Sequence, residues 1–348
     1  MPHLDPSVVE AVVARSTAAK PFSGVIVVRE QGHNVFAGAY GLANRSEALP
    51  NTLATRFGTA SGSKTFTAVA ICQLVARGLL AFDTPLLACL PTPVPPFDPD
   101  VTIHQLLTHT SGIPDYFDEA TMDHYAALWH DIPVYRLRSP VDFLPLFQDK
   151  PMQFVPGSRF HYNNAGFVVL ALVVEHLMGM AFPDYVTREV FQAGGMMSSG
   201  YFATDRLPAR TAYGYIEDQT GAGWRTNIFA VPIIGGGDGG AYVTAADVIT
   251  FWSGLLNSTF LPQALTHTLL TPHVQAQKHY RYGYGIWMTE LPNGAMKHVV
   301  SGGDPGVDFR STCYADRDLQ IVAIGNTSDG AGTIGKAIED LIEGLPLR

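Results

Sequence analysis

The pattern of apolar and polar positions predicts strands near both ends of the chain and helices between them. A first helix begins with Asp5 as its N-cap and Pro6 as its first helical residue. Two strands follow, over residues 22–30 and 35–43, joined by a polar turn. Beyond residue 200 short strands return at 213–216, 282–287, 297–301, 309–315 and 319–325, with helices at 248–256, capped by Thr244, and at 333–343.

The stretch between these two strand regions is helical or loop-like. Thr102 and Gln105 form a capping box that opens a short helix. A longer helix covers residues 165–178 and ends at Gly179. The order predicts an α/β fold in which an antiparallel sheet is flanked by helices and closed by both chain ends. An inserted, mainly helical domain completes it: residues 1–79 and 205–348 form the sheet domain, and residues 80–204 form the insertion.

Ser61 and Lys64 stand at the start of a predicted helix, directly before the apolar run 65–75. Residues three apart on a helix are neighbours, so the Lys64 amine can approach the Ser61 oxygen. A serine hydroxyl needs a base to become a nucleophile, and a helix N-terminus disfavours a second positive charge. Unpaired backbone N–H groups at the same place can stabilise an oxyanion. The alternative is a helix cap followed by a solvated lysine.

Tyr162 and Asn164 lie on the loop that precedes the helix over residues 165–178. Being two apart, they project to one side of an extended segment. A phenol can transfer a proton if a cation holds its pKa down, and an asparagine amide can donate to a substrate carbonyl. The alternative is an N-cap asparagine beside a buried tyrosine.

A third segment, Ser301-Gly302-Gly303, ends the strand predicted at 297–301. Adjacent glycines let a ligand approach backbone N–H groups, so the Gly303 amide is a candidate second oxyanion donor. The alternative is a plain strand that ends in an Asp-Pro-Gly turn.

Composition narrows the range of partners. Charged residues make up only 15% of the 348, and a net charge of −9 without any basic run argues against nucleic acid. The longest apolar run, 166–174, is broken by Glu175, so no membrane span is expected. The start of the chain lacks the features of a signal peptide, and the three cysteines look like core residues, so a cytoplasmic location is expected. The 12 histidines show no metal-ligand spacing, and the glycine-rich run 235–240 lacks the lysine of a phosphate loop; no metal or cofactor is expected.

In this order, the three signals resemble the serine β-lactamase and penicillin-binding-protein-like superfamily. The closest types are class C β-lactamases, D-alanyl-D-alanine peptidases and family VIII esterases. The resemblance covers nearly the whole chain and rests on four segments: 57–67, 101–116, 156–166 and 239–247.

The resemblance implies a serine hydrolase that forms an acyl-enzyme with a small-molecule or peptide substrate. Ser61 would be the acylated nucleophile, Lys64 its proton acceptor, Tyr162 the partner base and acid, and Asn164 a substrate-amide contact. β-Lactams, D-amino-acid peptides and short-chain esters stay open as substrates.

One departure concerns the third segment, where the family places Lys or His. This chain has Val300 there, and His298, two residues earlier on the same sheet face, either substitutes for that group or caps the strand. The alternative function is therefore a catalytically impaired, penicillin-binding-like ligand-binding protein.

Overall fold

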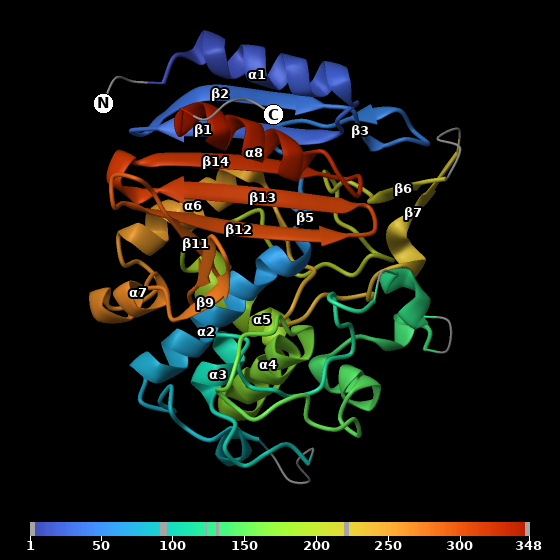
Figure 1. Ribbon diagram of the computed structural model, residues 1–348. Coiled ribbons are helices and arrows are strands. Elements are labelled where there is room, and N and C mark those ends of the chain that lie inside the picture. The colour runs from blue at the N-terminus through green and yellow to red at the C-terminus, as the bar shows by residue number, and fades with distance from the viewer. Residues whose placement is uncertain (1–3, 91–95, 123, 130–131, 219–222, 345–348) are drawn as a thin grey trace.

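The computed structural model describes residues 4–90, 96–122, 124–129, 132–218 and 223–344. An eight-stranded sheet of order β2-β1-β14-β13-β12-β11-β10-β9 forms its centre, and every neighbouring pair is antiparallel. Figure 1 shows that the first and last segments of the chain build this sheet together. Its strands are β1 (Gly24–Glu30), β2 (His33–Tyr40), β9 (Val274–Gln277), β10 (Tyr280–Tyr282), β11 (Trp287–Glu290), β12 (Met296–Asp304), β13 (Val307–Tyr314) and β14 (Leu319–Gly325).

Helices cover both faces of this sheet (Figure 1). On the outer face, α1 (Pro6–Ala19) and α8 (Ala331–Ile342) bury an apolar layer against β1 and β14. On the inner face, the larger core includes the buried face of α6 (Ala245–Leu256) and almost all of α2 (Lys64–Ala76). The other described α-helices are α3 (Ile103–Leu107), α4 (Asn164–Met178), α5 (Phe182–Val186) and α7 (Gln263–Leu269). Short strands form three separate pairs: β3 (Leu42–Asn44) with β4 (Leu49–Pro50), β5 (Phe57–Gly58) with β8 (Tyr242–Val243), and β6 (Tyr215–Glu217) with β7 (Trp224–Thr226).

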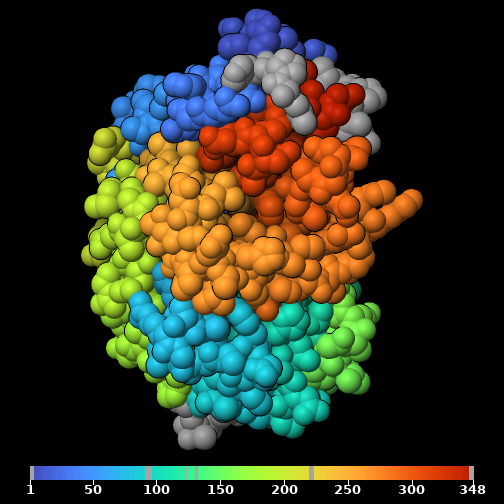
Figure 2. Space-filling model, turned by 90° about the vertical axis from the view of Figure 1, so that its left-hand side faces the viewer, coloured from blue at the N-terminus to red at the C-terminus, as the bar shows by residue number. Residues whose placement is uncertain are grey.

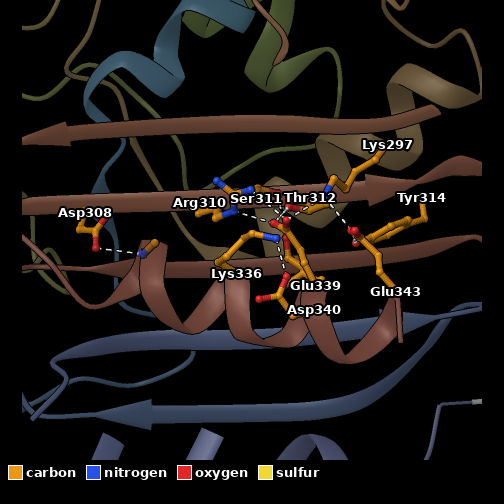
Figure 3. Close-up of polar contacts among 12 residues, drawn as sticks. Lys297, Asp308, Arg310, Ser311, Thr312, Tyr314, Lys336, Glu339, Asp340 and Glu343 are labelled. Atoms are coloured by element: carbon orange, nitrogen blue, oxygen red, sulfur yellow. Dashed lines mark hydrogen bonds and ion pairs between the residues drawn. The ribbon is translucent and has the colours of Figure 1, made fainter. Parts of the chain in front are cut away.

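A buried ionic network attaches α8 to the outer face of the sheet (Figure 3). Glu339 accepts hydrogen bonds from Arg310 at 2.6 Å, from Thr312 at 2.6 Å and from Lys297 at 3.1 Å. Lys297 also pairs with Glu343 at 2.6 Å. Each charge of this network therefore has a partner, as burial requires. Through Lys297, the network also fixes β12, the strand that carries the third sequence segment, to α8.

The described residues between 80 and 204 contribute no strand to the eight-stranded sheet. They form α3, α4, α5 and several short helical turns, and they occupy the half of the molecule drawn in cyan and green (Figure 2). The division into two domains stays a prediction.

Most helix ends lie where local sequence signals placed them. Asp5 accepts from the Ser7 N–H, Thr102 and Gln105 form the reciprocal capping box, and Thr244 accepts from the Asp247 N–H. Gly179 ends α4 in the left-handed conformation at φ 63°.

One predicted strand is wrong. Residues 282–287 contain the connection between β10 and β11 instead of one strand, because Gly285 has a left-handed φ of 71° that extended backbone does not allow. The strand predicted at 213–216 forms as β6, but it pairs with β7 in a separate two-stranded sheet and not in the main one.

Within the described ranges, no single helix is long and apolar enough to cross a membrane. Only α4 together with the segment Phe182–Gln192 passes that test, with a bend of 79° between them. Most residues of α4 are buried inside this fold.

Candidate active site

Ser61 lies in a short 3-10 helix, Ala60–Ser63, and α2 begins only at Lys64. Because residues i and i+3 of a 3-10 helix are eclipsed, this turn puts Lys64 directly beside Ser61. The Lys64 Nζ atom lies 2.9 Å from Ser61 Oγ. Ala60, just before the serine, has a φ of 44°, which is strained for a residue with a Cβ. The sequence predicted that the α-helix begins at Ser61, whereas it begins one turn later, at Lys64. The predicted contact between Ser61 and Lys64 is nevertheless present.

Lys64 is 1% exposed, so its amine sits inside the protein and not in solvent. Its Nζ atom also lies 2.8 Å from Asn164 Oδ1 and 2.8 Å from the Asp238 backbone oxygen. Burial lowers the pKa of Lys64, and the nearby charges of Asp238 and Glu119 oppose part of that effect. The solvated-lysine alternative therefore does not describe this structure, and the lowered pKa favours the neutral amine that can accept a proton.

Tyr162 is the second group near Ser61, and the two residues line the same cavity. Its ring centroid is 4.9 Å from Lys64 Nζ, and its ring is flanked by Trp287 at 5.9 Å and His109 at 4.4 Å. Burial raises the pKa of Tyr162 well above 10. The expectation that a cation would hold this pKa down is not met, so Tyr162 stays a phenol that can donate its proton.

Asn164 is placed by the start of α4. Asn163 caps this helix by accepting from the Gly166 N–H. The Asp115 carboxylate accepts from the Asn164 N–H at 2.7 Å and from the Ala165 N–H at 3.0 Å. The cap is thus Asn163 and Asp115, and the Asn164 side chain accepts from Lys64 through Oδ1 and donates to the Phe117 backbone oxygen through Nδ2.

The end of β12 passes directly beside the nucleophile. A Cβ on Gly302 would lie 2.3 Å from Thr59 O and 2.6 Å from Ser61 N, so only glycine permits this approach. Gly303, the next residue, faces open space and lines both cavities that adjoin Ser61. Gly303, the candidate oxyanion donor, thus lines the same cavities as Ser61.

The other candidate residues of β12 contribute less to this cluster. Ser301 is opposite Arg310 in the sheet register, so its side chain points to the face that carries α8, although the residue still lines the second cavity. His298 is buried, its Nε2 lies 3.2 Å from the Leu270 backbone oxygen, and it lines neither cavity. Val300 is buried in the inner core. His298 therefore does not take the place of a cation at this position.

Two cavities flank Ser61, one of about 660 Å³ and one of about 630 Å³. Ser61, Glu119 and Gly303 line both of them, whereas Asn164 lines the first and Tyr162 the second. Volumes of this size suit a small molecule or one or two residues of a peptide. No group of three or more His, Cys, Asp or Glu side chains in the described ranges is arranged to hold a metal ion.

Sequence reasoning missed Asp238, which lies in the glycine-rich run 235–240. The run passes so close to α4 that a Cβ on Gly237 would lie 2.1 Å from Phe167 O. This approach brings the Asp238 backbone oxygen to Lys64, while its carboxylate accepts from the Tyr116 hydroxyl. The only sequence signal for this role was that Asp238 is the single acidic residue in the glycine-rich run 235–240.

Known proteins with similar sequences or structures match nearly the whole chain. The chain is 32% identical to esterase EstB of Burkholderia gladioli, over 91% of this chain and 90% of that protein. It is 28% identical to penicillin-binding protein 4* of Bacillus subtilis (strain 168), over 93% of this chain and 73% of that protein. The crystal structure of a penicillin-binding protein from Bacillus halodurans superposes with a TM-score of 0.89 at 49% identity, covering 94% of this chain and 99% of the other.

The family model described as Beta-lactamase matches residues 9–339. The match includes the segments that carry Ser61, Lys64, Tyr162 and Gly303. The fold is the β-lactamase/transpeptidase-like fold, and the chain belongs to the beta-lactamase family.

Proposed function

We propose that Ser61 is the nucleophile through which this protein, a serine hydrolase of the beta-lactamase family, forms an acyl-enzyme with an ester or amide. The single observation that carries the assignment is the Lys64 Nζ to Ser61 Oγ contact of 2.9 Å at the junction of two cavities. A buried amine beside a serine hydroxyl in a cleft is the arrangement that activates a serine nucleophile.

The proposed reaction begins when Ser61 Oγ attacks the carbonyl carbon and its proton passes to the neutral Lys64 amine. A tetrahedral intermediate forms, and the Ser61 and Gly303 N–H groups stabilise its oxyanion. The bond to the leaving group then breaks, and Tyr162 donates its proton to the departing oxygen or nitrogen. Tyr162 recovers that proton from Lys64, and water hydrolyses the acyl-enzyme by the reverse of these transfers.

Short-chain esters are the substrates we propose to examine first, because esterase EstB is similar over nearly its full length. The buried Val300 offers no positive charge to a substrate carboxylate, which disfavours penicillins and peptides that end in a free carboxylate.

The test compares wild type with Ser61→Ala on a p-nitrophenyl ester, together with mass spectrometry of the intact protein after rapid quenching. Loss of turnover and of the covalent adduct, with an unchanged thermal melting curve, is the expected result. Turnover by Ser61→Ala equal to that of wild type would reject the assignment.

The binding-protein alternative rests on Val300. A fluorescent penicillin and a fluorophosphonate distinguish the two functions on the wild-type protein. Labelling at Ser61 by either probe supports the hydrolase, whereas failure of both probes favours the binder.

A further inference from the structure

The larger cavity beside Ser61 is rich in negative charge. Three carboxylates line it, those of Glu119, Asp238 and Asp304. The cationic or titratable nitrogen groups on the same lining are His124 and Arg225, and both residues are exposed at the surface. Lys64 lies beneath the cavity, with Ser61, Asn164 and Asp238 around its amine. A substrate anion would therefore meet repulsion deep in this cavity, and a cation would meet attraction.

Asp304 has the most informative position of the three. Side chains at 300, 302 and 304 share one face of β12, and that face approaches Ser61 at Gly302. Asp304 is two residues further, about 6.6 Å along the strand, and directly follows the proposed oxyanion donor Gly303. A group bound by Asp304 therefore lies within a few bonds of the carbonyl that Ser61 attacks.

The Asp304 carboxylate has no hydrogen-bond or ion-pair partner among the residues that the structure describes. Burial and the neighbouring charge of Asp238 raise its pKa to about 7, while Lys64 opposes this shift. Asp115, by contrast, is satisfied by backbone N–H groups at the start of α4. A half-buried carboxylate that is left unpaired beside a reaction centre is available for a ligand.

The rest of this cavity suits a cation. Tyr116, Phe117 and Tyr125 line it, and aromatic faces attract ammonium groups. The Tyr116 hydroxyl donates to Asp238, which fixes both side chains. Thr204, which is nine-tenths buried in the same wall, has a hydroxyl oxygen without any described hydrogen-bond partner. This oxygen can accept from an N–H group.

We propose that Asp304, with Asp238 and the adjoining aromatic wall, binds an ammonium group of the substrate close to the scissile carbonyl. The hydrolase then selects esters or amides that carry an amine near the reacting carbon. This inference rests on the proposed function, since it concerns the same nucleophile and the same cleft.

The test uses four achiral benzyl esters that differ at one position: those of glycine, glycolic acid and acetic acid, and the half ester of malonic acid. Benzyl alcohol release gives kcat/KM for wild type and for Asp304→Asn. Asp316→Asn, which removes the same charge from an exposed turn outside both cavities, is the matched control. Comparing each variant with wild type cancels the different intrinsic reactivities of the esters.

We expect Asp304→Asn to lower the ratio of kcat/KM for the glycine ester to that for the glycolic acid ester about tenfold or more. Asp316→Asn should change this ratio less than twofold, and wild type should use the malonic half ester least well. An unchanged ratio in a folded Asp304→Asn protein would overturn the inference.

Wild type alone provides a second measurement if Asp304→Asn does not fold. Benzylamine, protonated at pH 7.5, should inhibit hydrolysis of the acetic acid ester, followed here by release of acetate, at concentrations about tenfold or more below those of benzyl alcohol. Equal inhibition by the two compounds would contradict ammonium binding. Failure to hydrolyse any ester and to form an adduct at Ser61 would contradict the proposed function instead.

Discussion

Gly302 offers the sharpest test of the site geometry, because its contacts are with backbone alone. The methyl group of Gly302→Ala would lie 2.3 Å from Thr59 O and 2.6 Å from Ser61 N. Carbon normally rests about 3.5 Å from such atoms, so β12 and the 3-10 helix must separate by about 1 Å. No side-chain rotation relieves the overlap.

This displacement acts on both stability and catalysis. Inserting a methyl group into a closely packed contact costs about 1–3 kcal/mol of the free energy of unfolding. A shift of about 1 Å between Ser61 and the Gly303 N–H group should lower kcat/KM about 10²-fold, because oxyanion stabilisation depends on position.

Gly303→Ala is the matched control for stability. A Cβ at Gly303 meets no atom within 4 Å, so the free energy of unfolding should change by less than about 1 kcal/mol. Urea unfolding of both variants and ester hydrolysis by Gly302→Ala provide the measurements. A Gly302→Ala protein with wild-type kcat/KM would refute the proposal that β12 and the serine turn form one oxyanion site.

Lys64, Tyr162 and Glu339 allow further tests. Burial lowers the pKa of Lys64, so kcat/KM for a neutral ester should rise with pH below the usual lysine range. The Asp238 charge opposes that shift, so Asp238→Asn should move the rise to lower pH; an unmoved profile would contradict Lys64 as the base. Tyr162→Phe should lower kcat about 10²-fold or more in steady-state assays, and wild-type kcat would exclude proton donation by its phenol. Burial alone would raise the pKa of Glu339, but Arg310 and its other partners bring it from 4.5 to about 2. Such a lowered pKa stabilises the fold above pH 4.5 by about 3 kcal/mol, and this stability is lost as the pH falls towards 2. Glu339→Gln should remove at least that much at pH 7 in urea unfolding and flatten the pH dependence; wild-type stability would contradict the role of the network.

Signals that act within a few residues were predictable. The helix caps at Asp5, Thr102 and Thr244 depend on a side chain reaching an N–H group two or three positions away. The Ser61–Lys64 contact is equally local, and it holds even though the turn is 3-10 and not α.

Register and burial were less accessible to sequence reasoning. His298 had the right parity to face the site, but the pairing of β12 with β11 and the packing of Leu270 bury it in the core. Asp238 could not be identified from its neighbours in the sequence, because it contacts Lys64, which lies 174 residues away along the chain.

The sequence by itself determined most elements, their caps, the order of sheet and helical segments, and the Ser61–Lys64 pair, since each depends on neighbouring residues. Tertiary structure decided the charge of the cleft and the protonation of its groups. Those properties depend on which distant segments exclude water from a side chain and which charges they bring beside it. The burial of Lys64 and the partial burial of Asp304 exist only once the chain has folded.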